Sequence, residues 1–231
     1  MKRLERVGRG MAEVVLLVVG ILLAFWIDAS WERHQLRQVE ASLMEAVDQE
    51  VTENQEYLDS FLAIVDRGRA AHDRFMRASP EELMKMHDDS VGPQLLALSA
   101  PFTYDPSLAA TSTLLETSPL GSVSGLEIRM LLGRWVRGIE DSREEGAIVN
   151  ELGHETIRRV VEQVVADNKG YLPAGDSLFD AVGPSGLAQL RADEGFVAAH
   201  LGFWTFQSVY ASEIRSAGQV LDSLALIFDK R

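Results

Sequence analysis

The spacing of apolar residues along the chain predicts helices and no sheet. From Trp31 to Ala78, apolar residues recur every three or four positions, which places them on one face of an α-helix. Similar patterns run from Leu126 to Ala166 and from about Asp193 to Phe228. No alternation of apolar and polar residues lasts long enough to build a sheet. We therefore predict an all-α fold in which long and short helices pack as an antiparallel bundle.

Local motifs indicate where these helices begin and bend. Ser79, Pro80 and Glu82 fit a capping box, in which side chains bind the free N–H groups of a first helical turn. Asp105-Pro106 predicts another helix start. The helix over 31–78 would be roughly 70 Å long if unbroken. Gly68 lies inside it and predicts a bend.

The segment before residue 31 has a different pattern. Val14 to Ile27 is a run of fourteen residues without a charged or polar side chain. That run is short for a hydrocarbon core of about 30 Å, but the extended segment Met11 to Trp31 is long enough to span it. The alternatives are a cleaved signal peptide, a buried core helix and an uncleaved signal anchor. We favour the anchor, because Ile27-Asp28-Ala29 is a poor cleavage site and a core helix leaves the basic flank unexplained.

This interpretation predicts three regions and a topology. Residues 1–10 form a basic cytoplasmic tail, 11–31 a transmembrane signal-anchor helix, and 32–231 an acidic helical domain outside the cytoplasm. The tail is predicted to stay inside because positive residues flank the cytoplasmic side of a span. In a bacterium this means the inner membrane, with the main domain in the periplasm. The topology charges are Lys2, Arg3, Arg6 and Arg9, and the interfacial anchors are Trp26 and Trp31.

One face of the predicted span differs from the rest. Glu13, Gly20, Ala24 and Asp28 fall on one stripe of the helix, and Trp31 extends it. The small pair Gly20 and Ala24 lets another helix approach closely, either in a partner or in a second copy of the chain. Carboxylates cost less against protein than against lipid. We consider two interpretations of this face: a packing surface, or a tolerated glycine with both acids among the lipid headgroups.

Composition narrows the possible functions. The 231 residues carry a net charge of −13 and no cysteine. The acidity argues against nucleic acid, because neutralising phosphates requires an excess of Lys and Arg. Without cysteine the chain has no disulfide, no thiolate nucleophile and no iron–sulfur cluster. The lipid bilayer remains as a predicted partner.

The motif search predicts no enzyme. None of the five histidines has the spacing of a metal site, and His154-Glu155 fails as a zinc-protease motif because Arg158 stands in place of the second histidine. We therefore predict no catalytic residue, no metal and no cofactor. Residues 170–186 are rich in glycine and proline and predict a loop, whose apolar side chains either tuck back onto the bundle or dock a partner. The candidate docking residues are Tyr171, Leu172, Pro173 and Phe179.

Residues 12–58 carry a recognisable order of residues. Glu13, Leu16, Gly20, Ile21, Leu22 and Ala24 form E-x-x-L-x-x-x-G-I-L-x-A, and Trp31 and the element Glu50, Asn54, Leu58 follow. This order resembles a family of bacterial single-pass membrane-anchored helical proteins without an assigned activity. Weaker similarity continues at 112–132 and 190–196, while Ala12 departs from the family's usual glycine. The resemblance implies an anchor and a helical architecture, and nothing enzymatic.

These observations lead to three hypotheses of function. The first is a non-catalytic accessory subunit that docks on and braces a larger integral-membrane complex. We take an energy-transducing complex, photosynthetic or respiratory, as the working partner, although no motif selects it. The second is an envelope sensor or a module that binds a small ligand in the bundle. The third is an enzyme with an unrecognised carboxylate site.

Overall fold

The computed structural model describes residues 2–117, 123–167 and 178–230, with side chains from residue 18 onward apart from 117, 123 and 124. These residues form helices and no strand, which confirms the all-α prediction. The long helices are α1 (Lys2–Arg77), α5 (Val123–Asp141), α6 (Arg143–Asp167) and α8 (Glu194–Phe228). The short elements are α2 (Pro80–Leu83), α3 (Asp88–Ser99), α4 (Ala109–Thr117), the 3-10 turn η1 (Phe179–Ala181) and α7 (Pro184–Ala192).

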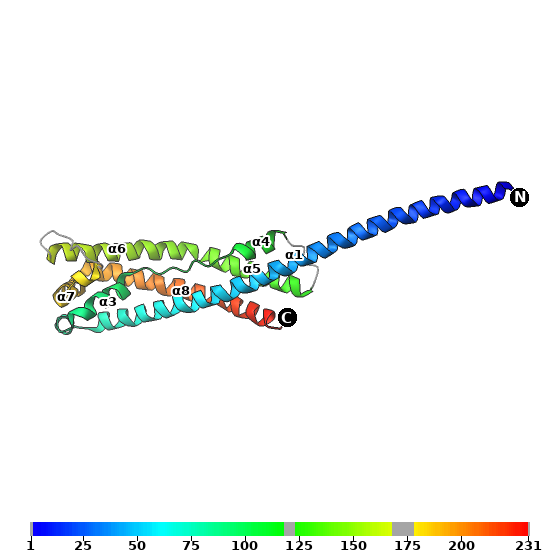
Figure 1. Cartoon of the computed structure of the whole chain (residues 1–231). Coiled ribbons are helices and arrows are strands. Elements are labelled where there is room, and N and C mark those ends of the chain that lie inside the picture. The colour runs from blue at the N-terminus through cyan, green and yellow to red at the C-terminus, as the bar shows by residue number, and fades with distance from the viewer. Residues whose placement is uncertain (1, 118–122, 168–177, 231) are drawn as a thin grey trace.

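Helix α8 is the centre of the bundle. It packs against α1, α5 and α6, and α5 and α6 follow each other along one side of it. Figure 1 shows α8 running opposite to the other three long helices. The segment after α3 returns along the bundle to α4, so that α1 and the α5–α6 pair run in the same direction. The bundle is therefore antiparallel about α8.

Two apolar clusters fill the bundle. The larger one lies between α1, α4, α5 and α8 and includes Phe61, Trp135 and Ile214. The second lies at the end where α3 and α7 meet α1, with Phe75 and Phe196 packed edge to face at 5.9 Å between ring centroids. Burial of such side chains stabilises the fold by about 1.5–3 kcal/mol for each one. Both clusters begin beyond residue 43 of α1, so the first part of α1 lies outside the core.

Side chains of α8 hold the return segment between α3 and α4 in place. Gln207 of α8 donates to the carbonyl oxygen of Phe102 at 3.0 Å, and Trp204 donates to that of Leu98, in the last turn of α3, at 3.1 Å. Tyr210 Oη accepts from the N–H of Tyr104 at 2.9 Å. These bonds satisfy backbone groups that would otherwise be buried without partners. The segment has no regular secondary structure through residue 108, so the helix expected from Asp105-Pro106 begins only at Ala109.

Helix α1 is continuous through Gly68, the expected bend point. An added Cβ at this residue would lie 2.4 Å from Cη2 of Trp204 and 3.0 Å from the carbonyl oxygen of Ala97. The glycine therefore allows the indole of α8 and the backbone of α3 to approach α1. The long pattern over 126–166, in contrast, is divided into α5 and α6 at Ser142, whose hydroxyl donates to the carbonyl of Ile139 at 2.9 Å.

Two predicted helix starts agree with the structure. Ser79 and Glu82 form the capping box at α2, with Ser79 N donating to Glu82 at 2.8 Å. Asp193 caps α8 by accepting from the N–H of Phe196 at 2.6 Å. Both motifs act within three residues, which is why the sequence is sufficient to locate them.

Candidate functional site

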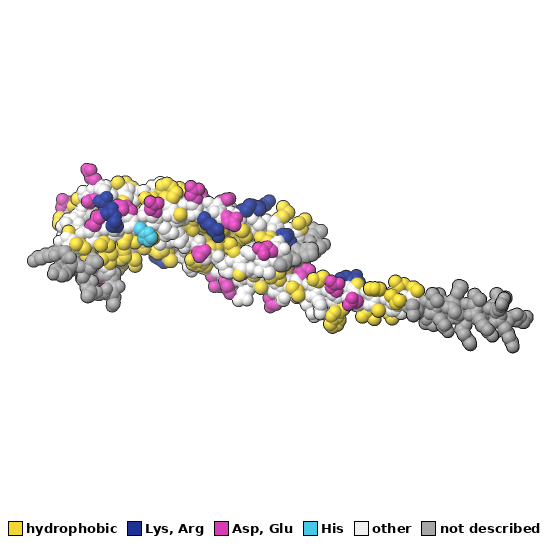
Figure 2. All heavy atoms as spheres, turned by 90° about the horizontal axis from the view of Figure 1, so that it is seen from above, with side chains coloured by type: hydrophobic (Ala, Val, Ile, Leu, Met, Phe, Trp, Pro, Cys, Tyr) yellow, Lys and Arg dark blue, Asp and Glu magenta, His cyan; other side chains and the backbone are white. Residues whose placement is uncertain are grey.

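The first half of α1 projects away from the bundle as a single helix (Figure 1). Its described apolar side chains are exposed all around the helix: Phe25, Trp26 and Trp31 are 69%, 64% and 63% exposed. Figure 2 shows apolar side chains along this projecting part. Leu36 and Val39 extend the exposed apolar surface toward the bundle. Soluble monomers rarely expose a large contiguous apolar surface, so this segment calls for a partner or a lipid environment.

The predicted packing face lies in this segment. An added Cβ at Gly20 would meet nothing within 4 Å, and Ala24 and Asp28 are exposed beside it. The side chains of Glu13 and of the topology charges Lys2, Arg3, Arg6 and Arg9 lie outside the described ones. Within the described part of the face, no other helix of the chain covers Gly20 or Ala24.

A search of the described residues finds no helix with a stretch apolar and long enough to cross a membrane. Residues 11–17 of the predicted span 11–31 have no described side chains.

The candidate docking loop is divided between described and undescribed residues. Tyr171, Leu172 and Pro173 lie outside the described residues. Phe179 begins η1 and packs, partly buried, against the second apolar cluster. Its ring is thus already in contact with the fold, as expected of a loop that tucks back onto the bundle. Docking of a partner by this loop stays a prediction.

A pair of histidines joins α1 to α8. His72 Nδ1 and His200 Nε2 lie 2.9 Å apart, so one ring nitrogen donates its N–H to the other. His200 is fully buried and stacks on Phe196 with 5.6 Å between ring centroids and 9° between the ring planes. Burial lowers the pKa of His200 to about 3, and burial also lowers the pKa of His72. Both imidazoles are therefore neutral at pH 7.

The histidine pair was not predicted from the sequence. The two residues are 128 positions apart in the sequence. The only sign of their burial in the sequence is that each histidine lies on the apolar face of its own helix. His72 opens onto a shallow polar hollow of about 300 Å³ that Arg69, Asp73 and Thr205 also line. In the described part of the chain, no three metal-ligating side chains gather closely enough to hold an ion.

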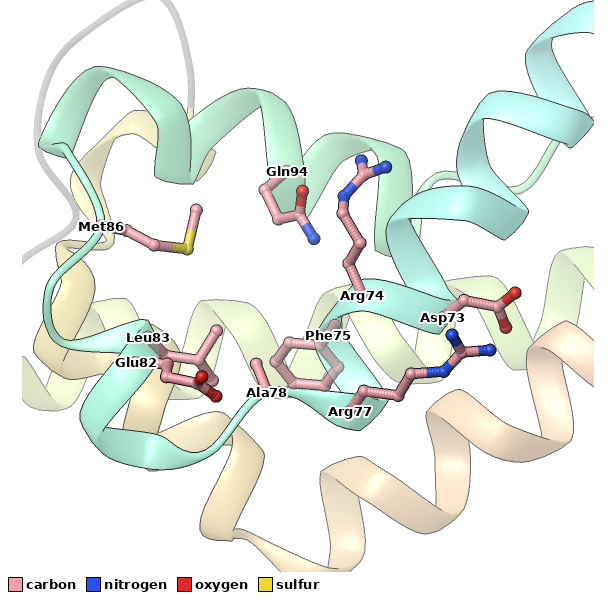
Figure 3. Close-up of a pocket in the computed structure, with 9 residues that line it drawn as sticks. All are labelled: Asp73, Arg74, Phe75, Arg77, Ala78, Glu82, Leu83, Met86 and Gln94. Carbon is pink, nitrogen blue, oxygen red and sulfur yellow. The ribbon is translucent and has the colours of Figure 1, made fainter.

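A second hollow lies at the end of the bundle farthest from the N-terminus. It measures about 470 Å³ and is bordered by the last turn of α1, by α2 and by α3. Figure 3 shows its lining, in which Arg74 and Arg77 accompany the apolar side chains of Phe75, Leu83 and Met86. These residues are not predicted from the sequence, because the spacing of Arg74 and Arg77 is ordinary for a helix end.

Comparison of the chain with models of protein families, with curated proteins and with solved structures finds no match.

Proposed function

We propose that the chain is a membrane-anchored, non-catalytic accessory subunit that docks on a larger integral-membrane complex and braces it. The observation that carries this proposal is the apolar surface that residues 18–27 of α1 expose on every side of the helix, part of which Figure 2 shows. A helix packed against one partner needs one apolar stripe, whereas a helix in lipid is apolar all round. A bilayer therefore fits this surface better than a protein groove does.

The length and the flanks of the segment support the same proposal. Met11 to Trp31 contains twenty-one residues, enough to span a hydrocarbon core of about 30 Å with Trp26 and Trp31 near one interface. The basic tail before it favours a cytoplasmic N-terminus, which leaves the acidic bundle on the other side. In this arrangement α1 connects the anchor to the core without a flexible joint.

The face of Gly20 and Ala24 is the part of the anchor that we assign to docking. Both positions are small and uncovered, so the backbone of a partner helix can approach closely there. Asp28 lies on the same stripe and would be better placed against protein than against lipid. A photosynthetic or respiratory complex stays the working partner.

Alkaline carbonate extraction of native membranes tests the anchor. We expect the full chain to remain with the lipid pellet, because extraction releases proteins that are held by surface charge alone. Release into the supernatant would contradict the anchor. A variant with Leu22→Lys and Phe25→Lys should be released, since each lysine is costly inside a hydrocarbon core.

Affinity purification in a mild detergent, followed by mass spectrometry, tests the docking. We expect integral-membrane subunits to accompany the chain in stoichiometric amounts. Gly20→Leu should release them, while the matched control Val19→Leu, at an exposed site off the stripe, should retain them. Recovery of the chain alone or as a homo-oligomer would refute the accessory-subunit proposal and leave the anchor standing.

A further inference from the structure

The hollow at the far end of the bundle has one wall that is strongly apolar. Ala78 and Met86 are half-buried and give this wall its accessible apolar surface, whereas Phe75 and Leu83 are buried in the second apolar cluster and are only 0% and 3% exposed. The unbranched thioether of Met86 adapts easily to the shape of an apolar guest. Each methylene group that a ligand removes from water at this wall favours binding. The volume of about 470 Å³ is within the range of pockets for small organic molecules.

Two cations stand at the other side of the hollow. Arg74 and Arg77 are exposed and lie one helical turn apart on the same face of α1. Among the described residues, neither forms an ion pair. In Figure 3 the guanidinium group of Arg77 lies on the opposite side of Phe75 from Leu83, toward Asp73, and that of Arg74 points toward α3 beside Gln94. The hollow thus has a cationic side and an apolar side.

Most of the nearby acceptors have other partners, and the carboxylate of Asp73, which also borders the hollow, forms no ion pair with either arginine. Glu82 accepts from the N–H of Ser79 at 2.8 Å as part of the capping box. The carbonyl oxygen of Met76 accepts from Arg191, and that of Ala71 accepts from Gln94, at 3.1 Å in both cases. A helix end by itself favours cations, but this does not account for the half-buried apolar side chains of Ala78 and Met86 beside them.

We infer that this hollow is a binding site for an amphipathic carboxylate, with the carboxylate held by Arg74 and Arg77 and the alkyl chain against the apolar wall. Guanidinium groups recognise carboxylates through paired N–H donors, which gives the head group its selectivity. The apolar wall then selects for a short alkyl chain. The ligand class is that of short and medium-chain fatty acids.

The place of the site indicates where such a ligand comes from. Arg77 lies 46 residues beyond Trp31 on one continuous helix, which corresponds to roughly 70 Å. If the chain is anchored as proposed, a lipid in the bilayer does not reach the hollow and the ligand arrives from the aqueous phase. This step rests on the proposed function, whereas the binding itself does not.

Methyl NMR of the full chain in lipid nanodiscs tests the inference with sodium octanoate as the probe. The seven methionines carry ¹³C-labelled methyl groups, and the Met86 signal is identified by its loss in Met86→Leu. We expect octanoate to shift the Met86 signal in a saturable manner. Octanamide, which has the same chain without the charge, should bind about tenfold more weakly or worse.

Charge variants separate the site from general partitioning into the nanodisc. The double variant Arg74→Gln/Arg77→Gln should weaken octanoate binding by about tenfold or more. The control Arg33→Gln/Arg37→Gln removes the same charge from an exposed part of α1 and should leave binding unchanged. Far-UV circular dichroism verifies that each variant is folded, and the single variants replace the double one if it is not.

Three results would overturn the inference: no saturable shift of Met86 at millimolar octanoate, equal binding of octanamide, or equal binding by the double variant. None of these results bears on carbonate extraction or on the purification of partners, so the ligand site and the proposed function fail separately.

Discussion

Glu50 is a buried carboxylate that holds backbone in place. Its two oxygens accept from the N–H groups of Ala110 and Thr111 at 2.8 and 2.9 Å, and from the hydroxyl of Ser107 at 3.2 Å. It thus caps the start of α4 from a different helix. A carboxylate near a helix N-terminus also interacts favourably with the helix dipole. Glu50 therefore links α1 to the start of α4.

Replacing Glu50 tests this role. We expect Glu50→Ala to lower the free energy of unfolding by about 2–4 kcal/mol, because it leaves buried N–H groups without acceptors. Urea unfolding of the full chain in a mild non-ionic detergent measures the change. Glu56→Ala, at an exposed site on the same helix, should change it by less than about 0.5 kcal/mol. Equal effects of the two substitutions would contradict the capping role.

The histidine pair predicts a pH dependence of stability. The pKa of His200 is lowered to about 3 by burial and by the neighbouring His72, whereas a histidine in the unfolded chain titrates near 6.5. Below pH 6.5 the unfolded state therefore binds a proton that the folded state does not. The free energy of unfolding should fall by up to about 1.4 kcal/mol per pH unit as the pH drops from 6.5 toward 3.

Urea unfolding at pH 7, 6 and 5 measures this dependence. We expect His200→Gln to reduce the loss of stability between pH 6 and pH 5, since the titrating ring is gone. His154→Gln, which removes an exposed histidine, should retain the slope of the unaltered protein. A slope that is the same in all three proteins would show that His200 is not the titrating group.

At the scale of whole elements, the contact of α1 with α3 and α8 depends on a glycine. Gly68→Ala should destabilise the protein by about 1–3 kcal/mol, because the indole of Trp204 is rigid and leaves no space for the added Cβ. At Gly133 in α5 the nearest atom to an added Cβ is the flexible end of Arg137, 3.6 Å away. Gly133→Ala should therefore stabilise the protein by about 0.5–1 kcal/mol through helix propensity.

Urea unfolding of both glycine variants distinguishes packing from propensity. If Gly68→Ala is as stable as Gly133→Ala, then α1 and α8 do not pack as closely as the structure indicates. A variant with both Gly68→Ala and Trp204→Phe offers a further comparison, since the smaller ring relieves part of the clash.

At the scale of the whole molecule, the projecting part of α1 and the bundle are separate in their packing. The buried part of α1 starts at Met44, and nothing in either apolar cluster precedes Leu43. Deleting residues 1–31 should therefore leave the helical content of the bundle unchanged. Its thermal midpoint should shift by only a few °C, which corresponds to a change of about 1 kcal/mol in the free energy of unfolding. Thermal circular dichroism measures this midpoint, and a chain that fails to fold would show that the anchor segment supports the core.

Much of the architecture follows from interactions between near neighbours. The recurrence of apolar residues every three or four positions is sufficient to predict α1 beyond residue 31 and α8 with its Asp193 start. The capping box at Ser79 is confirmed because its atoms lie within one helical turn. The apolar run over 14–27 likewise stands in the sequence itself, and the anchor built on it stays a prediction.

Other features depend on segments that are far apart in the chain. The helix expected at Asp105 starts late because side chains of α1 and α8 bind the backbone of residues 102, 104 and 107 outside any helix. Local propensity carries no information about those distant partners. The contact of His72 with His200 and the hollow at Arg74 also depend on segments that are far apart in the chain or follow α1. Each requires α1 to lie against elements that follow it in the chain, and that placement comes from packing of the apolar faces against α8. Periodicity shows that such faces exist, but not which residues meet across them.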